Sequence, residues 1–158
     1  MYATLHRSSE PGPAPGADLV LHQIGGPVTL TVHLTPDRPA DPSAYEVQQD
    51  CGLTEPDAVP TAAQVITFTG PLSEQVVAAA GRAARERIIP AMAAHPGSVR
   101  QLALWQPELR RQVVITLATS LRSLEEGGRR VGALPLLPGE DVALLPGPDH
   151  VEMFRVRE

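Results

Sequence analysis

The sequence predicts an α+β fold in which antiparallel strands and a few helices follow one another in a repeated order. Three observations lead to this prediction. Short β-rich runs bounded by Gly and Pro recur along all 158 residues, a single long amphipathic segment follows Ser73, and proline-rich loops stand where the first part of the chain would need helices. We therefore expect two halves built to one plan, the first of them poor in helix.

The second half, residues 63–158, shows the order most clearly. Ser73 caps a long helix whose apolar residues recur at helical spacing, Pro90 is expected to kink it, and His95-Pro96-Gly97 ends it. The Gly127-Gly128 pair weakens a second, shorter helix. The expected elements are a strand at 63–69, the long helix, a hairpin of strands 100–105 and 112–118, the short helix at 121–131 and a strand at 151–157. This β-α-β-β-α-β order is the ferredoxin-like arrangement.

The first half, residues 1–52, follows the same order without its helices. Prolines and glycines within 8–16 and 36–42 are incompatible with a helix. The expected strands are 2–7, a hairpin of 18–24 and 28–34, and 45–51. Residues 53–62 then form a linker. The first half is thus a degenerate copy of the second by element order alone.

Composition excludes several classes of function. The net charge is −5, and all 13 basic residues are arginines without a basic block, which argues against a nucleic-acid partner and excludes a lysine Schiff base. No apolar stretch approaches the roughly 20 residues of a membrane span, and no secretory signal begins the chain. The single cysteine, Cys51, forms no internal disulfide, which fits a reducing compartment. We expect a soluble, cytoplasmic protein.

A family resemblance covers residues 63–157. The strand, long helix and His95-Pro96-Gly97, then the hairpin up to Ser120 and the strand Val151-Glu152-Met153-Phe154-Arg155-Val156, resemble the antibiotic-biosynthesis monooxygenases of the dimeric α+β barrel superfamily. The resemblance implies two sheets that face each other across a barrel whose lumen binds a small organic molecule, here as a pseudo-dimeric barrel from one chain. Where many members carry Trp-x-Ser, this chain has Ala118-Thr119-Ser120, so that tryptophan's role does not carry over.

Candidate ligand-binding residues come from the faces of the two hairpins. Pairing Gln106 with Arg111 gives the second hairpin an apolar face, which we expect under the long helix, and a mixed face expected to line the lumen, with Gln101, Trp105 and Thr116 as ligand-binding candidates. Trp105 is either a filler of the core or a platform for an aromatic ligand. In the first hairpin His22 and His33 share a polar face. That face suits acid–base or ligand chemistry, or simple exposure to water.

No sharper signature is present. The sequence lacks a nucleophile elbow, a His-Glu-x-x-His motif, a phosphate loop and zinc-ligand spacings, so no metal is expected and no catalytic residue can be assigned. Adjacent acids such as Glu140-Asp141 are typical of a solvated loop.

These observations lead to a functional hypothesis with one alternative. The resemblance implies a cofactor-independent monooxygenase or a cyclase that acts on an aromatic, polyketide-like substrate in the lumen. The alternative is a non-catalytic module that binds a ligand or another protein. The expected partner is a small aromatic molecule, and the chain is either a monomeric pseudo-dimer or a homodimer.

Overall fold

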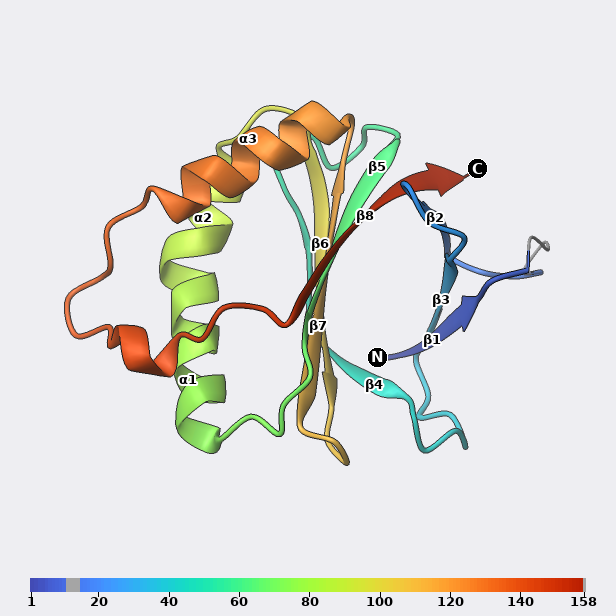
Figure 1. The fold of residues 1–158 in the computed structure, drawn as a ribbon, viewed down its shortest axis with the longest axis horizontal. Helices are drawn as coiled ribbons and strands as arrows, with labels where there is room; N and C mark the ends of the chain where they lie inside the picture. Colours follow the sequence, from blue (N-terminus) through green and yellow to red (C-terminus); the bar gives the residue numbers. More distant parts are fainter. Residues whose placement is uncertain (11–14, 158) are drawn as a thin grey trace.

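The computed structural model describes residues 1–10 and 15–157, and eight of its strands form one closed antiparallel barrel. Around the barrel the order is β1-β3-β2-β8-β5-β7-β6-β4. The helices lie on one side, against the sheet of β5–β8, and β1–β4 close the other side without helices (Figure 1). The predicted α+β class and the helix-poor first part are confirmed for the described residues.

Every predicted strand is present, with ends that differ by no more than two residues. Gly and Pro positions set these ends, as the sequence pattern indicates. The strands are β1 (Tyr2–Ser8), β2 (Leu19–Gln23), β3 (Thr29–Thr35), β4 (Tyr45–Gly52), β5 (Ala62–Phe68), β6 (Ser98–Gln106), β7 (Arg111–Ala118) and β8 (His150–Arg157).

The long helix begins where the sequence predicts and changes its winding near Pro90. The hydroxyl of Ser73 caps α1 (Glu74–Ala83) by accepting a hydrogen bond from the Val76 amide. A π-helical turn, η1 (Ala84–Ile88), follows and leads into α2 (Ile89–Ala93). Because a proline ring collides with the carbonyl four residues earlier, the wider turn just before Pro90 relieves that collision.

The remaining helical elements follow the second hairpin. Ser120 caps α3 (Leu121–Gly132), as the hydroxyl accepts from the Ser123 amide. The loop after it contains one short 3₁₀ turn, η2 (Val142–Leu144). In the first part of the chain, residues 36–44 form bends and a turn in place of a helix, as predicted. The other predicted helix-free segment, 8–16, lies partly outside the described residues.

Strand pairing closes the barrel between the two parts of the chain. β2 pairs with β8, and β4 pairs with β6, so each end of the first sheet is bonded to an end of the second. Read separately, the two parts have the same strand order, β4-β1-β3-β2 and β8-β5-β7-β6. The barrel therefore has no open sheet edge.

The core lies inside the barrel, so the prediction that the apolar face of the second hairpin lies under the long helix is wrong. Its apolar face packs in one cluster with apolar residues of β2, β3 and β8, not under the long helix. The cluster includes Leu102, Leu104, Val113, Ile115, Leu117, Leu21, Leu30, Val32 and Phe154. The physical reason is that the first sheet, without helices, can bury its own apolar face only against the second sheet.

Candidate functional site

The barrel interior is packed along much of its length and opens at one end into a cavity of about 950 Å³, here called the mouth cavity. Its walls combine strand residues with the loops that follow β5 and precede β4, β7 and β8. The lining residues are Leu5, Arg7, Ser43, Tyr45, Val65, Thr67, Thr69, Gln106, Leu109, Arg111, Val113, Asp149, His150, Val151 and Glu152. Such a volume falls within the range of ligand pockets.

Gln106 and Arg111 form one wall, since they face each other at the end of the β6–β7 hairpin. They continue the inward face of Leu104 and Val113, which pair one step deeper in the barrel. Gln106 is 4% exposed, and its Nε2 donates to the Ser43 carbonyl at 3.0 Å. Its Oε1, like the Nε of Arg111, is buried and has no hydrogen-bond partner among the described residues.

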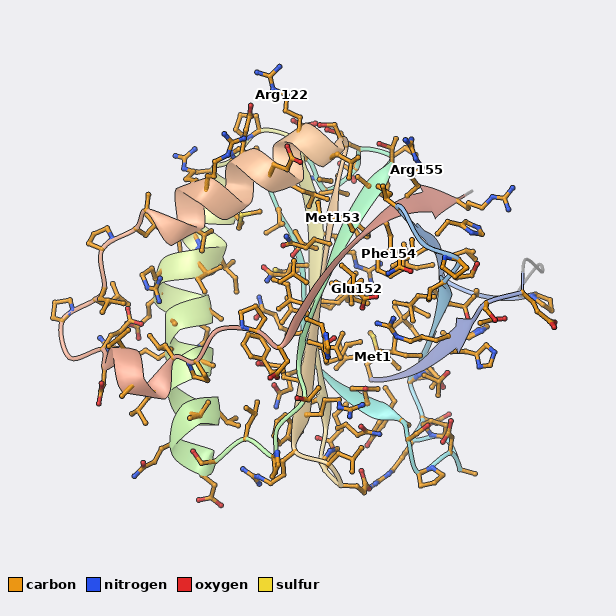
Figure 2. All side chains as sticks on the ribbon, viewed as in Figure 1. Met1, Arg122, Glu152, Met153, Phe154 and Arg155 are labelled. Carbon is orange, nitrogen blue, oxygen red and sulfur yellow. The ribbon has the colours of Figure 1, made fainter. Side chains whose placement is uncertain are left out.

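The opposite wall carries an ion pair between β1 and β8. Arg7 donates to Glu152 through both terminal nitrogens, at 2.6 and 3.0 Å, and Gln23 donates to the same carboxylate at 3.1 Å. Glu152 and Phe154 extend from β8 into the space between the two sheets (Figure 2). The hydrogen bond from Arg7 lowers the pKa of Glu152, with the nearby charges of Arg7 and His150 acting in the same direction, so this carboxylate stays ionised.

Other lining groups give the mouth cavity a polar interior and a partly apolar rim. Tyr45 is buried and lies near Arg7. The hydrogen bond to Glu152 raises the pKa of the Arg7 guanidinium, and Tyr45 adds a smaller contribution in the same direction. Thr67 pairs with both Val113 and His150 across neighbouring strands. At the rim, Leu109 and Val151 are about half exposed, with relative exposures of 51% and 52%. An aromatic or aliphatic body could rest on this rim while its polar groups reach inward.

Three of the predicted binding residues share one face of the second sheet, but it is the face on the helix side. Gln101 pairs with Thr116 between β6 and β7, and Trp105 lies further along the same outward face. Arg110 stacks over the Trp105 ring, 5.5 Å from its centre. The prediction that these side chains line the lumen is wrong, because side chains alternate along a strand and the apolar face points inward.

The two predicted histidines lie on the outer wall of the first sheet, across the barrel from that group. The Nδ1 of His22 lies 3.1 Å from the hydroxyl of Thr29, its partner across β2 and β3. The Nδ1 of His33 lies 3.2 Å from the Gly16 carbonyl. Both histidines face away from the lumen, so the structure does not bring them together with Trp105. Ligand binding by any of the five residues stays a prediction.

Residues 1–10 and 15–157 contain neither a membrane-spanning helix nor a cluster of metal-ligating side chains. No helix in this part of the chain is long and apolar enough to cross a membrane. Nor do three or more His, Cys, Asp or Glu side chains within it come together in a way that could hold a metal ion.

Comparisons with known proteins find similarity in structure only. No family model matches the sequence, and no curated protein matches it. A monooxygenase-like protein from Listeria innocua matches with a TM-score of 0.66 and 9% identity, over 99% of this chain and 94% of that one. A heme-degrading enzyme from Listeria monocytogenes matches with a TM-score of 0.61 and 8% identity, over 98% and 99%.

Two further matches connect the fold to the predicted resemblance. A ferredoxin-fold protein of Listeria monocytogenes, related to antibiotic biosynthesis monooxygenases, matches with a TM-score of 0.64 and 9% identity, over 99% of this chain and 94% of that one. An anthrone oxidase-like protein matches with a TM-score of 0.55 and 12% identity, over 99% and 91%. The chain therefore has the fold of the antibiotic-biosynthesis-monooxygenase-like proteins.

Proposed function

We propose that this chain is a small-molecule enzyme whose substrate binds in the mouth cavity. The observation that carries the proposal is the contrast within one barrel. The deep end is filled by the apolar cluster, whereas the mouth holds a cavity of about 950 Å³ with polar side chains inside it. Polar groups that converge on a cavity are typical of a ligand site, because they orient the ligand.

The reaction we favour is cofactor-independent oxygenation or cyclisation of an aromatic, polyketide-like substrate. His150 lies in the cavity wall and is the group best suited to take a proton from an acidic C–H or O–H of the substrate. In an oxygenation, the resulting substrate anion would react with dioxygen, so that a CH₂ group becomes a carbonyl and water is released. The structural likeness to an anthrone oxidase-like protein and to a monooxygenase-like protein supports this choice.

One observation favours a second candidate, a module that binds its ligand without converting it. Glu152 accepts three hydrogen bonds, from both terminal nitrogens of Arg7 and from Gln23. Asp149 accepts one from the Thr69 amide at 2.7 Å. The two carboxylates of the cavity wall are therefore poor proton acceptors, and only His150 is left as a candidate base.

A substrate panel with two matched variants tests the proposal. We would incubate the protein with anthrones and naphthols in air, follow quinone formation and oxygen consumption, and measure binding by calorimetry. Thr67→Phe adds a ring to the wall of the mouth cavity and should weaken both binding and turnover. Trp105→Phe changes the opposite face of the sheet and should leave both intact. His150→Gln should keep binding and lose turnover by about 10²-fold or more.

The outcomes separate the two candidates. Saturable binding without any product, unchanged in His150→Gln, supports the binding module. Binding that is unchanged in Thr67→Phe and lost in Trp105→Phe would place the ligand under the helices and overturn the mouth cavity as the site.

A further inference from the structure

We propose that Arg111 recognises a negatively charged oxygen of the ligand, so that the mouth cavity selects organic anions over their neutral counterparts. The anion belongs to the carboxylate, sulfonate or phenolate class. This inference rests on the proposed function, because it assigns the substrate class of the same cavity. It makes Arg111 the residue that determines specificity.

Arg111 is an unusual arginine within this chain. None of the ion pairs among residues 1–10 and 15–157 includes it. No described side chain or carbonyl accepts a hydrogen bond from its guanidinium, and its Nε is buried without a partner. The other described arginines that lack a partner, Arg85, Arg130 and Arg155, are exposed, whereas Arg111 is half-buried. A guanidinium is always charged, and burying it without an acceptor is unfavourable.

The carboxylates of the cavity do not compensate that charge. The pKa of Glu152 is lowered by Arg7, and that of Asp149 by hydrogen bonds from Thr69, with Arg111 contributing to neither. Glu152 is held by Arg7 and Gln23 on the other wall. The mouth cavity thus contains the Arg7–Glu152 ion pair, the Asp149 carboxylate held by Thr69, and the Arg111 guanidinium, which pairs with neither carboxylate among the described residues.

Gln106 gives a second, independent sign of an incomplete polar network. It is 4% exposed, lines the cavity beside Arg111 and has a buried Oε1 without a partner. A buried acceptor and a buried donor, left unpaired at facing strand positions, each cost stability unless a bound group completes their hydrogen bonds. A ligand with an anionic oxygen and a neighbouring hydroxyl or N–H group would complete both hydrogen bonds after a small rotation of the two side chains. The anionic oxygen would accept from Arg111, and the hydroxyl or N–H would donate to Gln106.

Geometry also explains why a guanidinium suits this place. Arg111 continues the inward face of Val113 and lines the mouth cavity, where an arginine can pack its apolar stem against the wall while its guanidinium binds a ligand. The planar guanidinium can bind a carboxylate or sulfonate through two parallel hydrogen bonds. The half-exposed rim residues Leu109 and Val151 would contact the apolar body of the same ligand.

A pair of fluorescent probes that differ by one anionic group tests the inference. The probes are 1-anilinonaphthalene-8-sulfonate and its neutral analogue N-phenyl-1-naphthylamine, titrated into the full chain at low and high salt. Wild type should bind the sulfonate about tenfold more tightly than the neutral probe. Arg111→Gln should remove that preference, and Arg111→Lys should keep part of it. The control Arg155→Gln removes an exposed arginine and should bind both probes as wild type does.

Thr67→Phe shows whether the probes occupy the mouth cavity, and each outcome is decisive. If both probes bind equally and both are weakened in Thr67→Phe, the anion inference fails while the site stands. If neither depends on Thr67, the proposed function fails as well. If Arg111→Gln has no cooperative melting transition, the variant is not folded and the test uses the wild type alone. Two small competitors are then compared for their ability to displace the sulfonate probe. Benzoate should then displace the sulfonate probe better than benzyl alcohol, and equal displacement would overturn the inference.

Discussion

The ion pair between Arg7 and Glu152 places two charges inside the mouth of a barrel whose deep end is apolar. The pair is short, with Nη2 to Oε1 at 2.6 Å, but Arg7 is still 46% exposed. Solvent therefore screens the interaction, and its contribution to stability is modest, about 1 kcal/mol. Its direction with pH is nevertheless clear, because the hydrogen bond from Arg7 lowers the pKa of Glu152.

Glu152 should make stability depend on acidity. A carboxyl whose pKa is lower in the folded state stabilises the fold fully above its unfolded pKa, about 4.3, and loses that contribution as pH falls through the folded value. We expect Glu152→Gln to lower the free energy of unfolding by about 1 kcal/mol at pH 7. The difference from wild type should shrink below about pH 4 in urea titrations.

Glu108→Gln is the matched control for that prediction. Glu108 pairs with Arg38 on the surface, where the two side chains are 46% and 62% exposed. Exposed pairs contribute little, so this variant should unfold within about 0.5 kcal/mol of wild type at every pH. An equal effect of the two substitutions would show that Arg7 and Glu152 are not specially coupled.

The residues of the mouth cavity could have been found from the sequence by one further step. The register that pairs Gln106 with Arg111 also places both on the inward, apolar face. Polar residues that end an apolar strand face indicate the place where a core opens to water. Arg7 ends the inward face of β1 after Leu5 in the same way. What the register alone could not show was which face pointed into the barrel.

At the scale of elements, local signals predicted every strand, the long helix and the short helix, but neither the 3₁₀ turn η2 nor the contacts of the loops. Ser73 and Pro90 act in the structure as the sequence indicates. Glu140 lies on the loop where the sequence places it, but its side chain is not solvated as expected. Its side chain is 3% exposed and accepts two hydrogen bonds from Arg87, which anchor the loop after α3 to the long helix. No local pattern could reveal a partner 53 residues away.

Two adjacent glycines in α3 give a matched test of how this helix packs. A Cβ at Gly127 would lie 3.1 Å from the end of Met92 and 3.2 Å from the ring of His95, whereas a Cβ at Gly128 would meet nothing within 4 Å. Alanine is favoured over glycine in a helix by about 0.5–1 kcal/mol. Gly128→Ala should therefore raise the free energy of unfolding by that amount.

Gly127→Ala should fail to give this gain, because Met92 and the buried His95 must shift to admit the methyl group. We expect it to be less stable than Gly128→Ala by about 1 kcal/mol or more, as measured by chemical denaturation. Equal stabilisation by the two substitutions would mean that α3 and the end of α2 pack more loosely than the structure shows.

At the scale of the molecule, the predicted and observed arrangements differ in which surface each sheet buries. Sequence periodicity shows that one face of the second hairpin is apolar, but an apolar face can be covered by a helix or by another sheet. Which of the two covers the hairpin depends on the first part of the chain, whose residues 36–44 form no helix that could cover the first sheet. The apolar face of the first sheet can be buried only against the second sheet. The apolar faces of both sheets therefore point into the lumen. The shared strand order supports our proposal that the parts are two ferredoxin-like halves.

If each half depends on the other for burial and pairing, the two should fold only as one unit. Residues 1–55 alone would expose the edges of β2 and β4 together with the apolar face that contains Leu21, Leu30 and Val32. Residues 60–158 keep the helices but expose the edges of β6 and β8. We expect at least one of these fragments to show no cooperative thermal transition by circular dichroism.

The matched control for the fragments is the complete protein cleaved after it has folded. Val59 in the linker is 67% exposed, so a protease site introduced beside it can be cut without disturbing the barrel. The cleaved halves should stay together through the β2–β8 and β4–β6 pairings and through the hydrogen bond from the Leu53 amide to the Val99 carbonyl. Their melting should depend on concentration, as association requires. Two fragments that melt cooperatively on their own, and that separate after cleavage, would show two independent domains and contradict the shared barrel core.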